Sequence, residues 1–205
     1  MSVLFNNPLL GAAGQGPSAD LGDTIEQSLR FTKDQYLSRT PSSEGNRRKF
    51  TYSGWVKRAD PSDSSMLFSA WGGSSFNTFE LYFLNTANGN GLQVYQWNGS
   101  SYDATHVTSN KFRDVAAWYH IVMAVDTEQS DQANRMRLWV NNQEVSFSTN
   151  TQFSQNTNTY VNTTQVHRIG NSSYNTTANR FDGYMAEVYF LDGQYLAPTD
   201  FGRFN

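Results

Sequence analysis

Residues 114–127 read DVAAWYHIVMAVDT, and this apolar stretch decides the fold class. If it forms a strand, successive side chains point to opposite faces. Both faces then carry apolar groups: Tyr119, Ile121, Met123 and Val125 on one, and Trp118, Val122 and Ala124 on the other. A strand that is apolar on both sides is covered on both sides. We therefore expect a central sandwich strand with the opposing sheet over one face and a long loop over the other.

His120 and Asp126 are the residues of this stretch that could carry chemistry. They share a face with Trp118, but six residues of strand separate them by about 20 Å, which is too far for a dyad. The chain has no G-x-S-x-G or H-E-x-x-H motif, and His106, His120 and His167 have no metal-ligand spacing. We expect His120 to be a hydrogen-bonded structural residue, and we assign neither catalytic nor metal-binding residues.

Short β-like runs separated by polar turns continue from Ser28 to the end of the chain. In residues 49–58, KFTYSGWVKR, four residues fall on one face (Phe50, Tyr52, Gly54, Val56) and four on the other (Thr51, Ser53, Trp55, Lys57). Roughly ten such runs without a helical period predict an all-β, two-sheet antiparallel sandwich. They read SLRF, QYLSR, KFTYSGWVKR, SMLFSAW, FELYFL, LQVYQW, WYHIVMAVD, MRLWV, VHRIG and YMAEVYFL.

Turn residues lie between these runs. NGNG at 88–91 and NGS at 98–100 tolerate positive φ, and Asn141-Asn142 lies where a tight hairpin turn is needed. The polar stretch 148–164 predicts a long loop anchored by Phe153, Tyr160 and Val161.

Composition indicates one domain stabilised by its core. The chain has 205 residues, 15% of them aromatic and 16% charged, and no cysteine, which excludes a disulfide framework and a thiolate metal site. The N-terminus lacks a basic start followed by a long apolar block, and no stretch of about 18 apolar residues occurs. We expect a soluble protein that does not insert into a membrane.

The net charge of −3 lies entirely in residues 1–26, which contain Asp20, Asp23 and Glu26 and no Lys or Arg. Residues 27–205 carry 15 basic and 15 acidic groups, so there is no excess of basic charge to neutralise phosphates. We therefore expect no nucleic-acid partner. The basic cluster at residues 47–49 is expected to be solvated at the beginning of a strand.

Residues 1–26 differ from the remainder. A short apolar piece, VLFNNPLL, precedes GAAGQGPSADLGD, which has no period and cannot bury enough surface to fold alone. We predict an extended N-terminal arm at 1–26 that orders against a partner, followed by one domain at 27–205. An N-terminal strand tucked along the domain is the alternative.

The order of motifs resembles the laminin-G-like, concanavalin A-like lectin/glucanase superfamily over about residues 27–204. SLRF, GWVKR, LFSAW, WYHIV, LWVN, RIGNSS and GYMAEV carry the resemblance. Within this superfamily the chain resembles versions found in virion proteins of tailed phages, especially marine ones. The resemblance implies a jelly-roll sandwich. Its members include lectins, glycan hydrolases, adhesion modules and structural domains, so it implies no single function.

A hydrolase needs two carboxylates at a set separation, and the glucanase branch of the family typically has E-x-D-x-E or E-x-D-x-x-E on one strand. Neither pattern occurs, and Glu80 and Glu187 stand alone on their strands.

Laminin-G-like domains sometimes bind Ca²⁺ at a loop rim. Three aspartates could contribute to such a site: Asp103, in a predicted loop, and Asp126 and Asp131. Ca²⁺ is therefore a possible cofactor, but we assign no residues to it, and we expect no other cofactor.

A sugar site combines aromatic platforms with polar side chains that bond hydroxyl groups. The segments FSAWGGSSFN, LQVYQWNGSSYD and GNSSYNTTANR place aromatic residues next to such groups. The candidate carbohydrate-binding residues are Trp71, Tyr95, Trp97, Tyr102 and Tyr174.

These observations predict a non-enzymatic phage virion structural protein of the capsid-decoration or head-fibre type. Residues 1–26 would attach it to other virion proteins, of capsid or tail, and the lectin-like domain would face outward toward glycans of the host surface or the environment. The short chain leaves no room for a long shaft. A receptor-binding tail fibre or adhesin module is the alternative, and a glycan hydrolase is less favoured. No heptad stem enforces an oligomer, so a homo-oligomer stays open.

Overall fold

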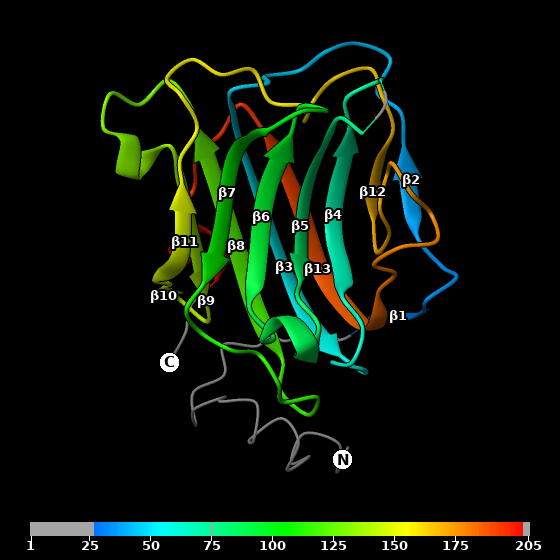
Figure 1. Ribbon diagram of the computed structural model, residues 1–205. Coiled ribbons are helices and arrows are strands. Elements are labelled where there is room, and N and C mark those ends of the chain that lie inside the picture. The colour runs from blue at the N-terminus through cyan, green and yellow to red at the C-terminus, as the bar shows by residue number, and fades with distance from the viewer. Residues whose placement is uncertain (1–26, 75, 203–205) are drawn as a thin grey trace, which may run out of the picture.

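The computed structural model describes residues 27–74 and 76–202, which form two packed antiparallel sheets (Figure 1). The six-stranded sheet has the order β1-β13-β3-β8-β9-β10, and the seven-stranded sheet has the order β11-β7-β6-β5-β4-β12-β2. The predicted all-β sandwich is confirmed. The strands are β1 (Leu29–Thr32), β2 (Leu37–Arg39), β3 (Lys49–Arg58), β4 (Ser65–Trp71), β5 (Thr78–Phe83), β6 (Leu92–Trp97), β7 (Tyr102–Thr108), β8 (Tyr119–Asp126), β9 (Met136–Val140), β10 (Gln143–Glu144), β11 (Phe147–Thr151), β12 (His167–Ile169) and β13 (Asp182–Asp192).

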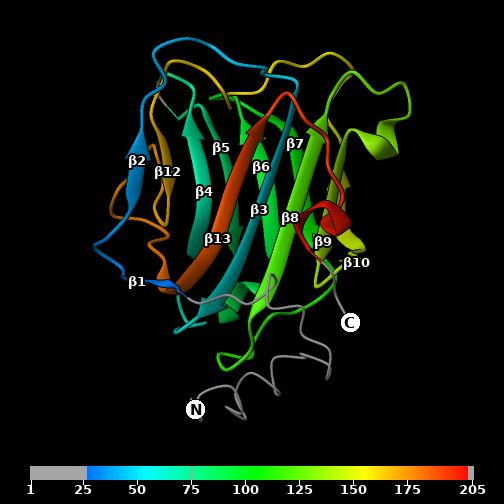
Figure 2. The ribbon, with the colours of Figure 1, turned by 180° about the vertical axis from the view of Figure 1, so that it is seen from behind.

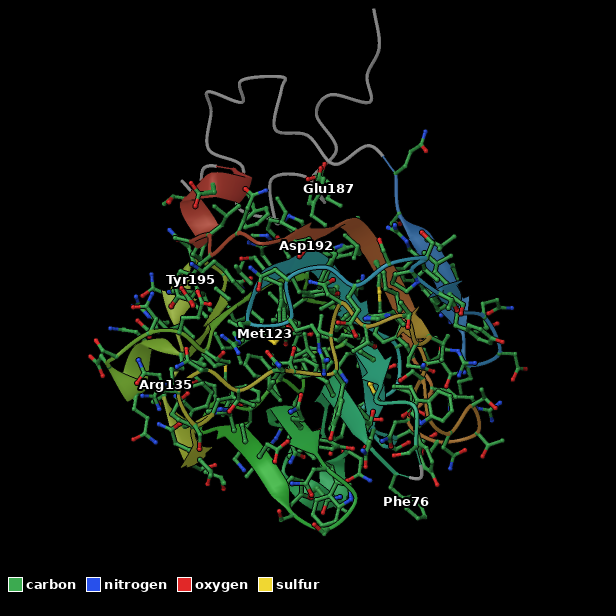
Figure 3. The ribbon with its side chains drawn as sticks, turned by 90° about the horizontal axis from the view of Figure 1, so that it is seen from above. Phe76, Met123, Arg135, Glu187, Asp192 and Tyr195 are labelled. Carbon is green, nitrogen blue, oxygen red and sulfur yellow. The ribbon has the colours of Figure 1, made fainter. Side chains whose placement is uncertain are left out.

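Aromatic side chains join the two sheets. Phe50 of β3 meets Phe79 of β5 edge-to-face at 5.7 Å between ring centroids, and Tyr52 of β3 meets Phe68 of β4 at 5.8 Å. All four rings are buried. Figure 3 shows Met123, from β8, in the middle of the molecule between the sheets. The alternation predicted for β3 and β8 therefore places the expected side chains in the core.

The second face of β8 is covered by the segment that follows β13 (Figure 2). Val122, Ala124 and Trp139 form a separate buried cluster against Tyr195 and Phe201. Phe201 ends a short 3-10 helix, η5 (Pro198–Phe201). The expectation that both faces are covered is correct, and the cover on this second face is the C-terminal segment.

His120 is structural. Its Nε2 lies 2.9 Å from Ser53 Oγ, and its ring stacks on Trp55 at 4.9 Å. Asp126 instead makes an ion pair with Lys49, with Nζ and Oδ2 3.1 Å apart. The two residues thus have separate partners, as the spacing along the strand predicted.

The turns follow the predicted chemistry. Asn141 and Asn142 have φ values of 50° and 63° between β9 and β10. A two-residue hairpin turn needs positive φ at both central positions, and Asn tolerates it. Gly99, between β6 and β7, has a φ of 91°.

Two predicted loops are partly wrong. Residues 102–108 form β7, although Asp103 was expected in a loop, because β7 buries small and polar residues (Ala104, His106, Thr108) that give no apolar pattern. Residues 148–151 belong to β11, paired with β7. Beyond β11 the loop expectation is correct: Phe153 and Val161 are buried, and Tyr160 packs on the core.

The basic cluster at 47–49 is half-buried rather than simply solvated. Arg47 Nε donates to Thr159 O at 2.9 Å, and Arg48 Nε donates to Asn158 Oδ1 at 2.8 Å. These side chains hold the loop at 152–166 against the start of β3.

No helix within residues 27–74 and 76–202 is long and apolar enough to cross a membrane. The arm predicted at 1–26 lies outside the described residues.

Burial lowers the pKa of His106 and of His120 to about 4. An unfolded chain has histidine pKa values near 6.5, so it takes up these protons first as pH falls. The free energy of unfolding should therefore decrease between about pH 6.5 and pH 4. NMR titration of the imidazole resonances should find both rings neutral at pH 5.5, and a midpoint near 6.5 for either ring would contradict this assignment.

Candidate functional site

The outer face of the seven-stranded sheet carries aromatic and polar side chains because of strand alternation. In β5, Phe79, Leu81 and Phe83 enter the core, so Thr78, Glu80 and Tyr82 face outward. In β6, Leu92 and Val94 enter the core, so Gln93, Tyr95 and Trp97 face outward. The strands that build the sandwich therefore also present one continuous outer surface.

Three of the predicted residues lie in one row across this surface. Trp71 is in register with Thr78, Thr78 with Trp97, and Trp97 with Tyr102, so the row crosses β4, β5, β6 and β7. The rings of Trp97 and Tyr102 are 4.8 Å apart at 71°, and Tyr102 is 49% exposed. Trp71, Trp97 and Tyr102 are called the aromatic row below.

Tyr95 precedes Trp97 on the same outer face of β6 and supports the aromatic row. Its ring meets Tyr102 edge-to-face at 5.5 Å and Tyr82 at 5.9 Å. Its hydroxyl donates to Glu80 Oε2 at 2.6 Å. Burial raises the pKa of Tyr95, and the neighbouring Glu80 raises it further. Tyr95 therefore positions Tyr102 and is itself held by Glu80.

Glu80 is a buried acceptor that connects the strands to the loop after β12. It is 3% exposed, and its Oε1 accepts from Ser172 Oγ at 2.7 Å and from Thr78 Oγ1 at 3.4 Å. Burial raises its pKa, while the donors from Tyr95, Ser172 and Thr78 lower it. Ser69 on β4 adds a second attachment, since its Oγ donates to Asn171 O and accepts from Ser173 N. The loop thus covers part of the outer face of β4 and β5.

Tyr174 lies in this loop and forms a second aromatic pair. Its ring is 4.9 Å from that of Phe76, which is labelled in Figure 3. Both are exposed, by 39% and 57% respectively. Phe76 was not among the predicted residues, although a single aromatic residue in the Gly- and Ser-rich stretch GGSSFN was a visible signal. The structure therefore separates Tyr174, paired with Phe76, from the aromatic row.

Polar loops border the end of the sheet at which the aromatic row lies. Asn98 accepts from the backbone N–H of Ser100 and of Ser101, which shapes the β6–β7 turn. A side chain at Gly99 would collide with Asn77 Oδ1 at 2.8 Å, so the β4–β5 and β6–β7 loops touch. Aromatic faces beside amide and hydroxyl groups are the combination that binds the apolar face and the hydroxyls of a sugar.

The paired carboxylates of a glycosidase are not assembled by Glu80 and Glu187. Glu80 belongs to β5 of the seven-stranded sheet, and Glu187 belongs to β13 of the six-stranded sheet. Figure 3 shows Glu187 and Phe76 on opposite sides of the molecule. Both oxygens of Glu80 already accept hydrogen bonds from protein groups, which suits a structural role.

The aspartates considered for Ca²⁺ have protein partners of their own. Asp103 accepts from Gln96 and Asn98, Asp126 pairs with Lys49, and Asp131 caps a short 3-10 helix through Ala133 N. Within residues 27–74 and 76–202 no cluster of three or more His, Cys, Asp or Glu side chains could hold a metal ion.

The chain belongs to the concanavalin A-like lectin/glucanases superfamily, whose family pattern matches residues 31–197. Comparison with curated protein sequences found no match.

Solved structures with the same fold include two laminin regions and a sialidase module. The laminin alpha2 LG1-3 region has a TM-score of 0.60 at 14% identity, covering 85% of this chain and 33% of that one. Mouse laminin alpha1 LG4-5 has 0.56 at 11%, covering 85% and 46%. Ruminococcus gnavus IT-sialidase CBM40 has 0.52 at 16%, covering 80% and 95%, and it was also solved bound to alpha2,3 and alpha2,6 sialyllactose. This chain therefore spans less than half of either laminin region and nearly the whole of the sialidase module.

Replacing Glu80 with Ala should destabilise the protein by about 1–3 kcal/mol, because the donors of Tyr95 and Ser172 lose their buried acceptor. Glu80→Gln retains one acceptor oxygen and should cost less. Urea unfolding measures both changes. Glu44→Ala, which removes a largely exposed side chain, is the control and should change stability by less than about 0.5 kcal/mol. Equal effects of Glu80→Ala and Glu44→Ala would contradict the role of Glu80.

Proposed function

We propose that this protein is a non-enzymatic glycan-binding module displayed on a phage particle. The observation that carries the glycan-binding part is the aromatic row, in which strand register sets Trp71, Trp97 and Tyr102 in one line on the outer face, with Tyr102 exposed and both tryptophans half-buried. Membership of a lectin-like superfamily and the sialyllactose complexes of the CBM40 module support a carbohydrate ligand.

Binding without hydrolysis is proposed because the outward-facing carboxylate beside the aromatic row, Glu80, is buried and already bonded. A glycosidase needs a second carboxylate within about 5 to 9.5 Å of the first. Asp103 accepts a hydrogen bond from the side chain of Gln96. The register partner of Gln96 is Ala104, which is a core residue, so Gln96 and the carboxylate that it bonds lie on the inner side of the sheet. The arrangement thus favours retention of a sugar over its cleavage.

The location on a virion rests on the sequence resemblance to phage proteins and on the composition of residues 1–26. In this proposal residues 1–26 attach the domain to capsid or tail proteins, as a decoration or head-fibre protein. The alternative, a tail-fibre adhesin, uses the same aromatic row for specific host recognition.

Substitution of single residues of the aromatic row should weaken glycan binding. A glycan array probed with the intact protein should give specific binding that falls at least tenfold in Trp97→Ala and in Tyr102→Ala, since an aromatic anchor at the centre of a contact commonly contributes more than about 1.4 kcal/mol. Tyr189→Ala is the matched control, because Tyr189 is also an exposed tyrosine (48%) but lies on β13 of the other sheet. Equal losses in all three variants, or no specific binding by the wild type, would overturn the glycan-binding proposal.

Release of reducing ends from a bound polysaccharide is the measure of hydrolysis. We expect none, and release that disappears in Glu80→Gln would instead assign a glycosidase.

Removal of residues 1–26 should prevent attachment to particles while the remaining chain keeps its thermal unfolding transition. Immunogold labelling of intact particles gives position and copy number: regular labelling of heads supports a decoration protein, and labelling at tail tips supports the adhesin. A truncated protein that still labels particles normally would show that the arm is not the anchor.

A further inference from the structure

A groove opens at one side edge of the sandwich, where the edge strands of both sheets come together. β1 ends the six-stranded sheet and β2 ends the seven-stranded sheet, and both lie on the same side of the molecule (Figures 1 and 2). The groove has a volume of about 340 Å³. Its apolar lining comes from both sheets: Leu29, Phe31, Met185 and Val188 from the first, and Leu37 and Ile169 from the second.

The groove combines apolar side chains with free strand edges. Leu29 and Leu37 are 50% and 51% exposed. In the described part of the chain no strand lies beyond β1 or β2 in its sheet, so each edge retains backbone groups that can pair with another strand. An open strand edge is a template on which another strand can pair, and exposed apolar side chains beside it favour an apolar partner.

The charge of the groove favours an uncharged occupant. Glu187 is the one charged residue of its lining. It has a φ of 47° at a register shift in β13, between Ala186 and Tyr189. An extended peptide with apolar side chains and no charge can enter such a groove without taking a charge of its own out of water.

The chain itself supplies such a peptide, and it leaves the domain at the groove. Gln27 and Ser28 belong to the lining, so the preceding 26 residues start at its mouth. Residues 3–10 read VLFNNPLL and contain no charged side chain. Residues 11–26, GAAGQGPSADLGDTIE, are rich in Gly and Ala and can act as a tether.

We propose that residues 3–10 of the same chain dock in this groove as an added strand. A Gly- and Ala-rich tether of sixteen residues spans on average about 20–24 Å, which is enough to turn back to its own point of origin. Such a tether gives an effective concentration on the order of 1 mM, so a dissociation constant of about 0.1 mM for the free segment already fills about nine grooves in ten. Docking covers Leu29 and Leu37 and pairs a free edge.

This contact lies away from the aromatic row, so it goes beyond the glycan-binding proposal and is tested independently of it. It also gives the arm a second role. In a particle-attachment function the docked state would keep the apolar segment covered until a particle surface competes for it.

Disulfide trapping in the full-length chain tests the docking, since the protein has no cysteine of its own. The trapping pair is Leu4→Cys with Leu37→Cys. The matched reference is Leu4→Cys with Ser38→Cys, because Ser38 is the next residue on β2, equally close to the tether, and points to the opposite face. Both positions are exposed, so the substitutions should leave the fold intact. Disulfide formation is followed in a glutathione buffer at micromolar protein by non-reducing electrophoresis and peptide mass spectrometry.

We expect an intramolecular disulfide in the Leu37 pair at a rate at least tenfold above that of the Ser38 pair, after correction for the reactivity of each single cysteine with a small thiol reagent. Adding Phe5→Asp should reduce the rate to that of the reference. Equal rates of disulfide formation in both pairs would show that residues 3–10 do not dock in the groove and would overturn the proposal. Dimers whose rate rises with protein concentration would overturn it in favour of the segment of a second copy. Glycan binding by the same variants reports the aromatic row separately.

Discussion

Aromatic packing between the two sheets is the constraint on which the rest of the structure depends. The chain has no cysteine, so no disulfide can join the sheets, and they are held together by the packing of side chains between them. Phe50 and Tyr52 on β3 reach Phe79 and Phe68 on the opposing sheet. Large rings bury much apolar area each and pack with a defined geometry. This packing determines which face of every strand is turned inward, and therefore which residues remain on the outside.

The composition of the candidate site follows from which face of each strand is turned inward. Once Phe79 and Leu81 enter the core, Glu80 must face outward, and once Val94 enters, Tyr95 must do so. Antiparallel register then brings Glu80 beside Tyr95 and Trp97 beside Tyr102. The same register that stabilises the sheet assembles the aromatic row, so the surface proposed to bind glycans stands on rigid strands rather than on loops.

Local pattern was informative wherever one face of a strand is strongly apolar. The alternation in residues 49–58 and 119–126 placed the core correctly, and Asn141-Asn142 identified a hairpin turn. β7 was not predicted, because its inward face carries only small or polar residues (Ala104, His106, Thr108) and so gives no apolar alternation in the sequence. His106 can be buried there because its Nδ1 lies 2.9 Å from Asn150 Oδ1, a partner 44 residues away that no local pattern reveals.

The sequence by itself determined the all-β class, the alternation of faces in β3, the central position of β8, and the absence of a His120–Asp126 dyad, because the two-residue period of a strand is a local property of the chain. It also singled out the aromatic residues that were considered for a sugar site. Only the tertiary structure decided that Trp71, Trp97 and Tyr102 form one row, that Tyr174 pairs with Phe76, and that Glu80 is a buried acceptor. These facts depend on register between strands and on the path of a loop, both of which are set by contacts between residues far apart in sequence.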